Sequence, residues 1–177
     1  MTKRILSIDP GVKHAGVAYW MEHSGLYYLE LAYLATLAGT PTLARSVSEM
    51  PQACELGHVQ PSASFARCDH VVVELPQVYS RDKSKGDPND LIKVAAVAGA
   101  ISKGVFAEAR SFVLPAEWKG AAPKLVTEAR CRNYLTDSEL EKIILPTKSL
   151  QHNVWDAIGI GLWYLKKNKL RSTRGDV

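Results

Sequence analysis

Apolar runs in the first part of the chain predict four β-strands. Residues 4–9 and 15–21 flank a Pro-Gly turn, and an aromatic, β-rich run follows at residues 26–35. A short and wholly apolar run, HVVVE at residues 70–74, is typical of a strand that is buried on both faces. We therefore expect three antiparallel strands in a meander, and then a buried strand that lies parallel to the first.

The second part of the chain combines helical patterns with one more strand. Asp87 is a typical N-cap and Pro88 suits the first helical position, so we expect a helix from here to about residue 107. Another helix is expected to begin near Pro51. The remaining predicted elements are a strand at residues 110–114 and helices at residues 123–135, between a cap at Thr136 or Ser138 and Pro146, and at residues 152–169. These elements predict an α/β fold with a mixed five-stranded sheet, antiparallel in its first three strands and then parallel, flanked by helices.

Length and composition are typical of one compact domain. The chain has 177 residues, of which 46% are hydrophobic, and this suits a single sizeable core. We expect one domain over residues 1–171 and a flexible tail over residues 172–177. No stretch reaches the length of a membrane span and no signal-peptide pattern is present, so we expect no membrane association and a cytoplasmic location, in a bacterial or phage-infected bacterial cell.

The charge of the chain is unevenly distributed. Residues 1–79 contain 5 Lys and Arg against 7 Asp and Glu, whereas residues 80–177 contain 17 against 11. The second part is therefore the basic part. An excess of this kind is a modest indication of a polyanionic partner, although basic helix faces are also common on proteins that bind no nucleic acid.

Three acidic residues lie at positions that an ordinary role on the surface does not explain well. Asp9 ends the first predicted strand, Glu74 ends the fourth, and Asp156 lies in the first turns of the apolar last helix. If the first and fourth strands are parallel neighbours, their carboxyl ends lie at the same edge of the sheet, where open α/β sheets place ligands. Three carboxylates brought together repel one another unless a cation is present. Mg²⁺ or Mn²⁺ fits such oxygen ligands, and a pair of these ions ~3.5–4 Å apart is the usual arrangement for phosphodiester hydrolysis.

The order of motifs along the chain also resembles a known family. These motifs are IDPG-x(4)-GVA, then VVVE, a basic loop, a helix of small residues, a strand followed by W-K and a later K, and finally H-N-x-x-D-A-x-G-I-G. The ordered set, which spans nearly the whole chain, resembles the RuvC-type Holliday junction resolvases of the RNase H-like superfamily. The resemblance implies an RNase H-like fold and a dimeric, metal-dependent endonuclease that nicks two opposed strands of a four-way DNA junction.

The resemblance implies a metal-binding role for Asp9, Glu74 and Asp156. Many relatives have a fourth acidic or histidine ligand one helical turn before the final Asp, where this chain has His152 and Asn153. Both lie on the helix face of Asp156. We favour His152 as a metal ligand or as the group that orients or deprotonates the attacking water. The alternative is that His152 or Asn153 only caps the helix.

Basic and aromatic residues are candidates for contact with DNA. Lys119 and Lys124 match lysines that the family uses near the scissile phosphate, although exposed lysines are common in such loops. The loop after Glu74 carries further candidates, and its alternative role is that of a solvated surface loop. These candidates are Arg81, Lys83 and Lys85 for contact with the phosphate backbone, and Tyr79 for stacking at the junction centre.

Two opposed cuts need two active sites, which a two-fold homodimer supplies. The helix over residues 87–107 is our candidate for the interface, and its alternative is packing against its own sheet. Three other functions stay open at this point. One is an RNase H-like nuclease that acts on flaps or other branched DNA, and another is a junction-binding protein without catalysis, against which the presence of all three acids counts. The third is an actin-like or sugar-kinase-like ATP-binding module, because D-x-G followed by Gly16-Val17 also occurs in the first phosphate loop of those proteins.

Overall fold

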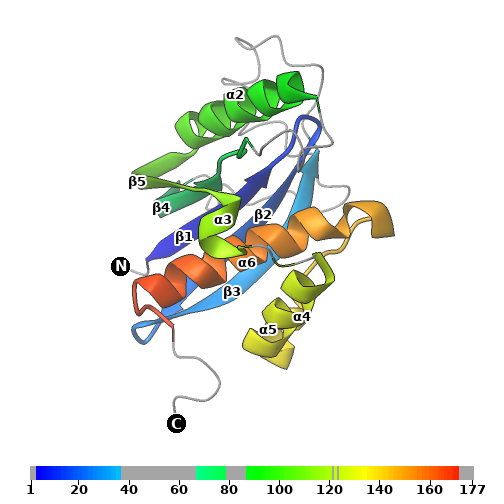
Figure 1. The fold of residues 1–177 in the computed structure, drawn as a ribbon. Helices are drawn as coiled ribbons and strands as arrows, with labels where there is room; N and C mark the ends of the chain where they lie inside the picture. The colour runs from blue at the N-terminus through cyan, green and yellow to red at the C-terminus, as the bar shows by residue number, and fades with distance from the viewer. Residues whose placement is uncertain (1–2, 37–66, 79–86, 121, 123, 172–177) are drawn as a thin grey trace.

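The computed structural model describes residues 3–36, 67–78, 87–120, 122 and 124–171. Its centre is a five-stranded sheet with the order β3-β2-β1-β4-β5 (Figure 1). The strands are β1 (Arg4–Pro10), β2 (His14–His23), β3 (Leu26–Thr36), β4 (Arg67–Glu74) and β5 (Phe106–Val113). The first three are antiparallel, and β1, β4 and β5 run parallel to one another. The predicted mixed sheet is confirmed.

Helices cover both faces of this sheet. The helices are α2 (Pro88–Gly104), α3 (Pro115–Trp118), α4 (Lys124–Tyr134), α5 (Asp137–Leu140) and α6 (Gln151–Lys167), with a 3₁₀ turn, η2, at Lys148–Leu150. Figure 1 shows α6 lying across the strands, with α3 and α4 beside it. None of the described helices has the length and apolar character needed to cross a bilayer.

Two apolar cores result from the alternation of side chains along the strands. On β4, Val72 packs into the core beneath α6, whereas Val71 and Val73 pack into the core beneath α2. All three valines are fully buried, as expected for a central parallel strand with helices on both faces. The core beneath α6 holds the largest buried side chains, Trp20 and Trp155.

Local chemistry explains where several helices begin. The Asp87 side chain accepts a hydrogen bond from the Asn89 backbone N–H at 2.9 Å, and Pro88 occupies the first turn of α2. Thr136 caps α5 and forms a capping box with Glu139. Both predicted caps are therefore confirmed, with Thr136 rather than Ser138 as the second.

The boundary between α2 and β5 was predicted wrongly. The helix ends at Gly104 instead of residue 107, and β5 begins at Phe106 instead of residue 110. Val105 already has extended backbone angles, and the chain then pairs with β4, with Phe106 opposite Arg67. An apolar stretch of this length suits a helix end or a strand equally, so pairing with β4 decided the outcome. The short helix α3 was not predicted, and the helix expected near Pro51 lies outside the described residues.

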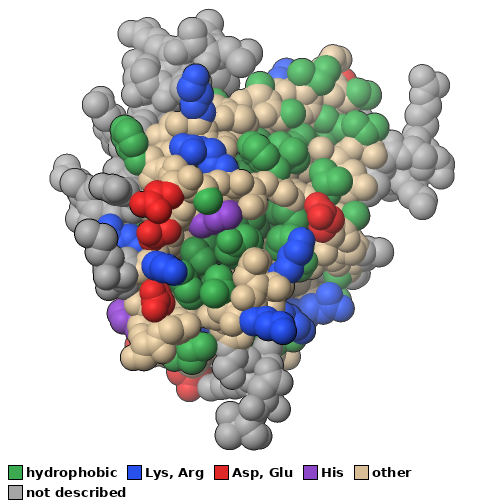
Figure 2. All heavy atoms as spheres, turned by 90° about the vertical axis from the view of Figure 1, so that its left-hand side faces the viewer, with side chains coloured by type: hydrophobic (Ala, Val, Ile, Leu, Met, Phe, Trp, Pro, Cys, Tyr) green, Lys and Arg blue, Asp and Glu red, His purple; other side chains and the backbone are tan. Residues whose placement is uncertain are grey.

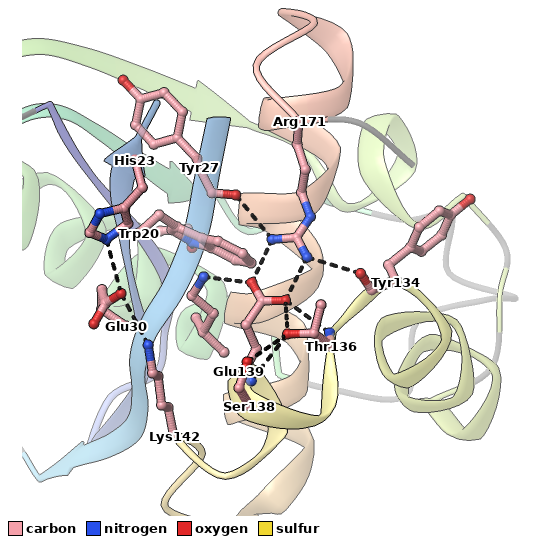
Figure 3. A network of polar contacts seen from close by, with 12 residues as sticks. Trp20, His23, Tyr27, Glu30, Tyr134, Thr136, Ser138, Glu139, Lys142 and Arg171 are labelled. Atoms are coloured by element: carbon pink, nitrogen blue, oxygen red, sulfur yellow. Dashed lines mark hydrogen bonds and ion pairs between the residues drawn. The ribbon is translucent and has the colours of Figure 1, made fainter. Parts of the chain in front are cut away.

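One buried acid, Glu139, joins the end of the chain to the sheet (Figure 3). Its side chain is 1% exposed, and the Arg171 guanidinium donates to both carboxylate oxygens at 2.7 Å. The Leu29 backbone N–H on β3 donates to the same carboxylate at 2.7 Å, and Thr136 donates through its backbone and its hydroxyl. Burial alone would raise the pKa of Glu139, but these donors hold the pKa below its ordinary value.

Candidate active site

Two of the predicted acids meet at the carboxyl edge of the parallel strands. Glu74 is the last residue of β4, and Asp156 projects from the second turn of α6 with only 6% of its surface exposed. The ammonium of Lys119, just after α3, lies 2.9 Å from Asp156 Oδ2 and 3.7 Å from Glu74 Oε2. One lysine therefore stands between two acids that are 82 positions apart in the sequence (156 minus 74).

The third predicted acid, Asp9, belongs to the same edge. It lies on β1, which is the parallel neighbour of β4, and the aligned pair Ile8 and Val73 places Asp9 beside the end of β4. Burial acts to lower the pKa of the Lys119 ammonium, but nearby carboxylates raise it above its ordinary value. Those carboxylates belong to Glu74, Asp156 and Asp9, so the charge of Asp9 also acts on the lysine.

A tryptophan, Trp118, holds Glu74 in place. The indole N–H of Trp118 donates a hydrogen bond to Glu74 Oε2. The Trp118 ring lies against Gly159 of α6, where an added Cβ would be only 2.4 Å from a ring carbon. Gly159 in the I-G-I-G motif thus leaves room for Trp118. The W-K pair of the sequence is the signal for this contact, because it puts both partners of Glu74 side by side.

The first turn of α6 packs closely against β2, the strand that pairs with β1 at Asp9. Gly16 on β2 lies opposite Asp9, and an added Cβ at Gly16 would be 1.9 Å from the carbonyl oxygen of Asn153. The helix begins at Gln151, with Leu150 as its N-cap residue. His152 and Asn153 are therefore within the first turn, and the alternative that either caps the helix is wrong. His152 is half-buried and lies four residues before Asp156, on the same helix face.

The charges in this site are incompletely balanced. Burial raises the pKa of Glu74, the Lys119 charge and the Trp118 hydrogen bond act to lower it, and repulsion from Asp156 raises it further. The net result is a pKa above the ordinary value of a glutamate. Additional positive charge at this site would stabilise the ionised form of Glu74.

The donor set of the site is suited to a hard divalent metal. It consists of carboxylate oxygens, which Mg²⁺ and Mn²⁺ prefer, and the burial that raises the pKa of Glu74 makes its charged form costly without a cation. Within the described residues, no group of three or more His, Cys, Asp or Glu side chains is arranged closely enough to hold a metal ion. The acids converge on the Lys119 ammonium instead.

The other predicted contact residues are placed only in part. Lys124 is the first residue of α4, and its side chain is outside the described part of the structure. Tyr79, Arg81, Lys83 and Lys85 also lie outside the described residues. Of the remaining tryptophans, Trp155 is a core residue that is 2% exposed, and Trp163 packs at the edge of the same core.

The sheet order, the three antiparallel strands and the crossing helix α6 define an RNase H-like fold. The structure is similar to RuvC of Thermus thermophilus in complex with a Holliday junction substrate, with a TM-score of 0.55, 17% identity, and coverage of 96% of this chain and 99% of that chain. It is also similar to the fowlpox virus Holliday junction resolvase, with a TM-score of 0.53, 15% identity, and coverage of 93% and 99%. The yeast mitochondrial Holliday junction resolvase gives a TM-score of 0.52 at 11% identity, covering 95% and 81%. No protein-family model and no curated protein matches the sequence.

Proposed function

We propose that this protein is a metal-dependent endonuclease that resolves four-way DNA junctions by paired, symmetric nicks. The observation that carries this proposal is the convergence of buried acids on Lys119 at the carboxyl edge of a RuvC-like sheet. Two similar solved structures are described as Holliday junction resolvases and a third as RuvC in complex with a Holliday junction substrate, and all three are covered over 81% or more of their length. We propose a single nuclease domain over residues 1–171.

The proposed chemistry assigns a role to each side chain of the site. Asp9, Glu74 and Asp156 would hold divalent metal ions, with two ions per site expected, and His152 would complete the ligand set or orient the attacking water. When bound, such ions make water a better nucleophile and neutralise charge on the phosphodiester. The water oxygen forms a bond to phosphorus while the bond to the leaving sugar oxygen breaks. Lys119 and Lys124 would stabilise the negative charge on the phosphate.

The arrangement of Trp118 gives it a positioning role in this proposal. The Trp118 indole N–H contacts only Oε2 of Glu74 and fixes the rotamer of that side chain. The other carboxylate oxygen has no contact with the indole. Lys119 provides charge compensation before any metal ion is bound. Both residues come from the same short segment after β5, so the ends of β4, β5 and α6 together build the site.

A homodimer would give the two active sites that paired cuts require. We propose that α2 and the edge strand β5 form its interface, because both expose large apolar side chains. Ile92 of α2 is 68% exposed, and Phe106 and Phe112 of β5 are 70% and 47% exposed. Figure 2 shows hydrophobic side chains gathered over the upper and middle part of the face that it displays. An exposed apolar patch of this kind on a strand at the sheet edge is typical of a protein interface.

The loop after β4 is the proposed contact with the junction. Arg81, Lys83 and Lys85 would bind phosphates, and Tyr79 would stack on an unpaired base. The basic character of residues 80–177 supports a polyanionic substrate.

A cleavage assay with defined substrates tests the proposal. A labelled four-way junction, a duplex, a flap and a single strand are each incubated with Mg²⁺, Mn²⁺ or EDTA. We expect symmetric nicks confined to the junction and abolished by EDTA. Equal cutting of flaps and junctions would favour the broader branched-DNA nuclease. A folded protein that cuts none of these substrates with either metal would contradict the proposal, and ATP binding and junction binding without catalysis would then be measured.

A further inference from the structure

A pocket of about 300 Å³ lies between α3, α4 and α6, directly beside the candidate active site. Trp118 and Lys119 form part of its wall, and the same two residues contact Glu74 and Asp156. The pocket therefore adjoins the candidate active site, but its other lining residues are different ones. None of the described residues that line it is acidic. Its volume is at the lower end of the range for pockets that bind small molecules.

The positive charge in this pocket is only partly used within the protein. Lys119 is paired with Asp156, and Arg171 is paired with Glu139. Arg130 of α4 and Lys166 of α6 are both exposed and have no acidic partner among the described residues. Arg130 and Lys166 line the same pocket, and the Lys166 ammonium also lies 5.9 Å from the Tyr134 ring centroid. Cations without an acidic partner in a pocket suit the binding of a phosphate.

A buried hydroxyl in the lining has no partner. Thr127 is 5% exposed, and its Oγ1 makes no hydrogen bond within the described structure. Leaving a buried polar group without a partner is costly, and nearly all buried polar groups in proteins have one. The hydroxyl is not accessible from the pocket as the side chain stands, so a ligand would become its partner once Thr127 rotates about χ1.

Aromatic side chains complete the pocket. Trp118, Tyr134 and Trp163 all line it, and each is partly exposed. A flat heterocycle such as a nucleic-acid base is stabilised by stacking on such rings, and this holds for any of the bases. The lining thus combines surfaces for a planar base with cations for a phosphate, and these are the two parts of a nucleotide.

We propose that this pocket binds a nucleoside monophosphate unit, with the base against the tryptophans and the phosphate at Arg130 and Lys166. The unit is either an unpaired nucleotide of the DNA strand or a free nucleotide, and the chemistry of recognition is the same. The strand version rests on the proposed nuclease function. In that case the bound nucleotide contacts Trp118 and Lys119, which hold Glu74 and Asp156, so the pocket positions the strand relative to the cut.

The first test is binding of dTMP without metal, observed by NMR at the indole N–H signals. The chain has 4 tryptophans, so the pocket and its controls are read in one spectrum. We expect the signals of Trp118 and Trp163 to shift, while Trp20 and Trp155, which are 0% and 2% exposed, stay unchanged. Thymidine and inorganic phosphate are titrated separately, and each should bind more weakly than dTMP. Unchanged Trp118 and Trp163 signals at millimolar dTMP would overturn the proposal.

Variants separate ligand binding from folding. Arg130→Ala removes an exposed cation and should weaken dTMP binding about tenfold or more. Thr127→Val keeps the volume of the side chain, so it should also weaken binding while leaving thermal stability unchanged or higher. Lys103→Ala, an exposed cation on α2, is the matched control and should bind dTMP like the wild type. Wild-type affinity in both pocket variants would overturn the proposal.

The second test distinguishes the two sources of the nucleotide. A junction with one unpaired thymidine is compared with the same junction carrying an abasic site there. Tighter binding of the first, lost in Arg130→Ala, supports the strand version. If dTMP binds but the two junctions bind equally, the pocket takes a free nucleotide. Failure of the nuclease proposal would leave dTMP binding intact, whereas failure of this inference would leave junction cleavage intact in both pocket variants.

Discussion

Glu139 and Glu74 are both acids with little exposed surface, but the protein surrounds them in opposite ways. Glu139 receives donors from Arg171, Leu29 and Thr136, and its pKa is held below the ordinary value (Figure 3). Glu74 receives one indole N–H and shares one ammonium with Asp156, and its pKa is raised. The donors around Glu139 outweigh the cost of its burial, whereas those around Glu74 do not.

The difference distinguishes an acid that the fold satisfies by itself from one that it does not. A buried carboxylate that serves only stability is satisfied by the protein itself, as Glu139 is. A carboxylate kept in an unfavourable charge state costs stability, and such strain is found mainly where a ligand, ion or reaction will relieve it. We therefore propose that Glu74 and its neighbours are functional acids and that Glu139 is a structural acid of the scaffold.

The largest expected effect is on cleavage by variants of the functional acids. Asp9→Asn, Glu74→Gln and Asp156→Asn should each lower the rate of junction cleavage by about 10²–10³-fold or more, because each removes a charge that would bind metal. Junction binding, measured by gel shift in EDTA, should persist. Each variant is compared with the wild type in a labelled-junction assay. Cleavage that survives in one of them would remove that acid from the site.

The structural acid should show the reverse pattern. Glu139→Gln leaves the Arg171 guanidinium without its ion partner, and breaking a buried pair costs about 3–5 kcal/mol in the free energy of unfolding. Urea denaturation measures this loss. Glu128→Gln, which breaks the more exposed pair with Arg132, is the matched control and should cost no more than about 1 kcal/mol. Equal losses in the two variants would contradict the structural assignment of Glu139.

Gly159→Ala tests whether α6 positions Glu74 through Trp118. The added Cβ would meet the Trp118 ring, so we expect a loss of about 1–3 kcal/mol in the free energy of unfolding. Cleavage should also fall under conditions where the variant is folded, because the indole can no longer hold Glu74. The control is Gly99→Ala on α2, where an added Cβ would meet no neighbouring atom within 4 Å. There the same substitution should raise the free energy of unfolding. A fully active Gly159→Ala enzyme would exclude the positioning role.

The smallest effects concern pH, and they have opposite signs for the two acids. The pKa of folded Glu139 is below 4.5, so its stabilisation is present above about pH 4.5 and is lost as the pH falls through the folded value. The pKa of folded Glu74 is above 4.5, so its protonated form favours folding, and that contribution is lost as the pH rises through the folded value. Urea titrations of Glu139→Gln and Glu74→Gln in EDTA, from pH 3 to 8, measure both. The first variant should lose acid sensitivity, and the second should be more stable than the wild type near neutral pH.

Local pattern was sufficient to predict most of the fold. The first four strands, the cap at Asp87 and the last helix were predicted close to their observed bounds, because each has a strong period or a clear breaker. The start of β5 was missed because Val105, Phe106 and Ala107 suit a helix and a strand alike. The pairing with β4 that decides between them is not visible in the local sequence.

Prediction of the candidate site was limited in the same way. The strand-end positions of Asp9 and Glu74 indicated a shared edge, and the structure places them there. The contact of Trp118 with Glu74 joins residues 44 positions apart, and the pairing of Arg171 with Glu139 spans 32 positions. Neither follows a period, and only the folded chain brings them together.

The most direct test of the account is a Mn²⁺ titration followed by EPR and calorimetry, with wild type, Glu74→Gln and Glu139→Gln compared at a temperature where all three are folded. We predict that the wild type and Glu139→Gln bind up to two ions per chain, and that Glu74→Gln loses at least one of them. Equal binding of Mn²⁺ by Glu74→Gln and the wild type would contradict the assignment of the acids around Lys119 as the metal site.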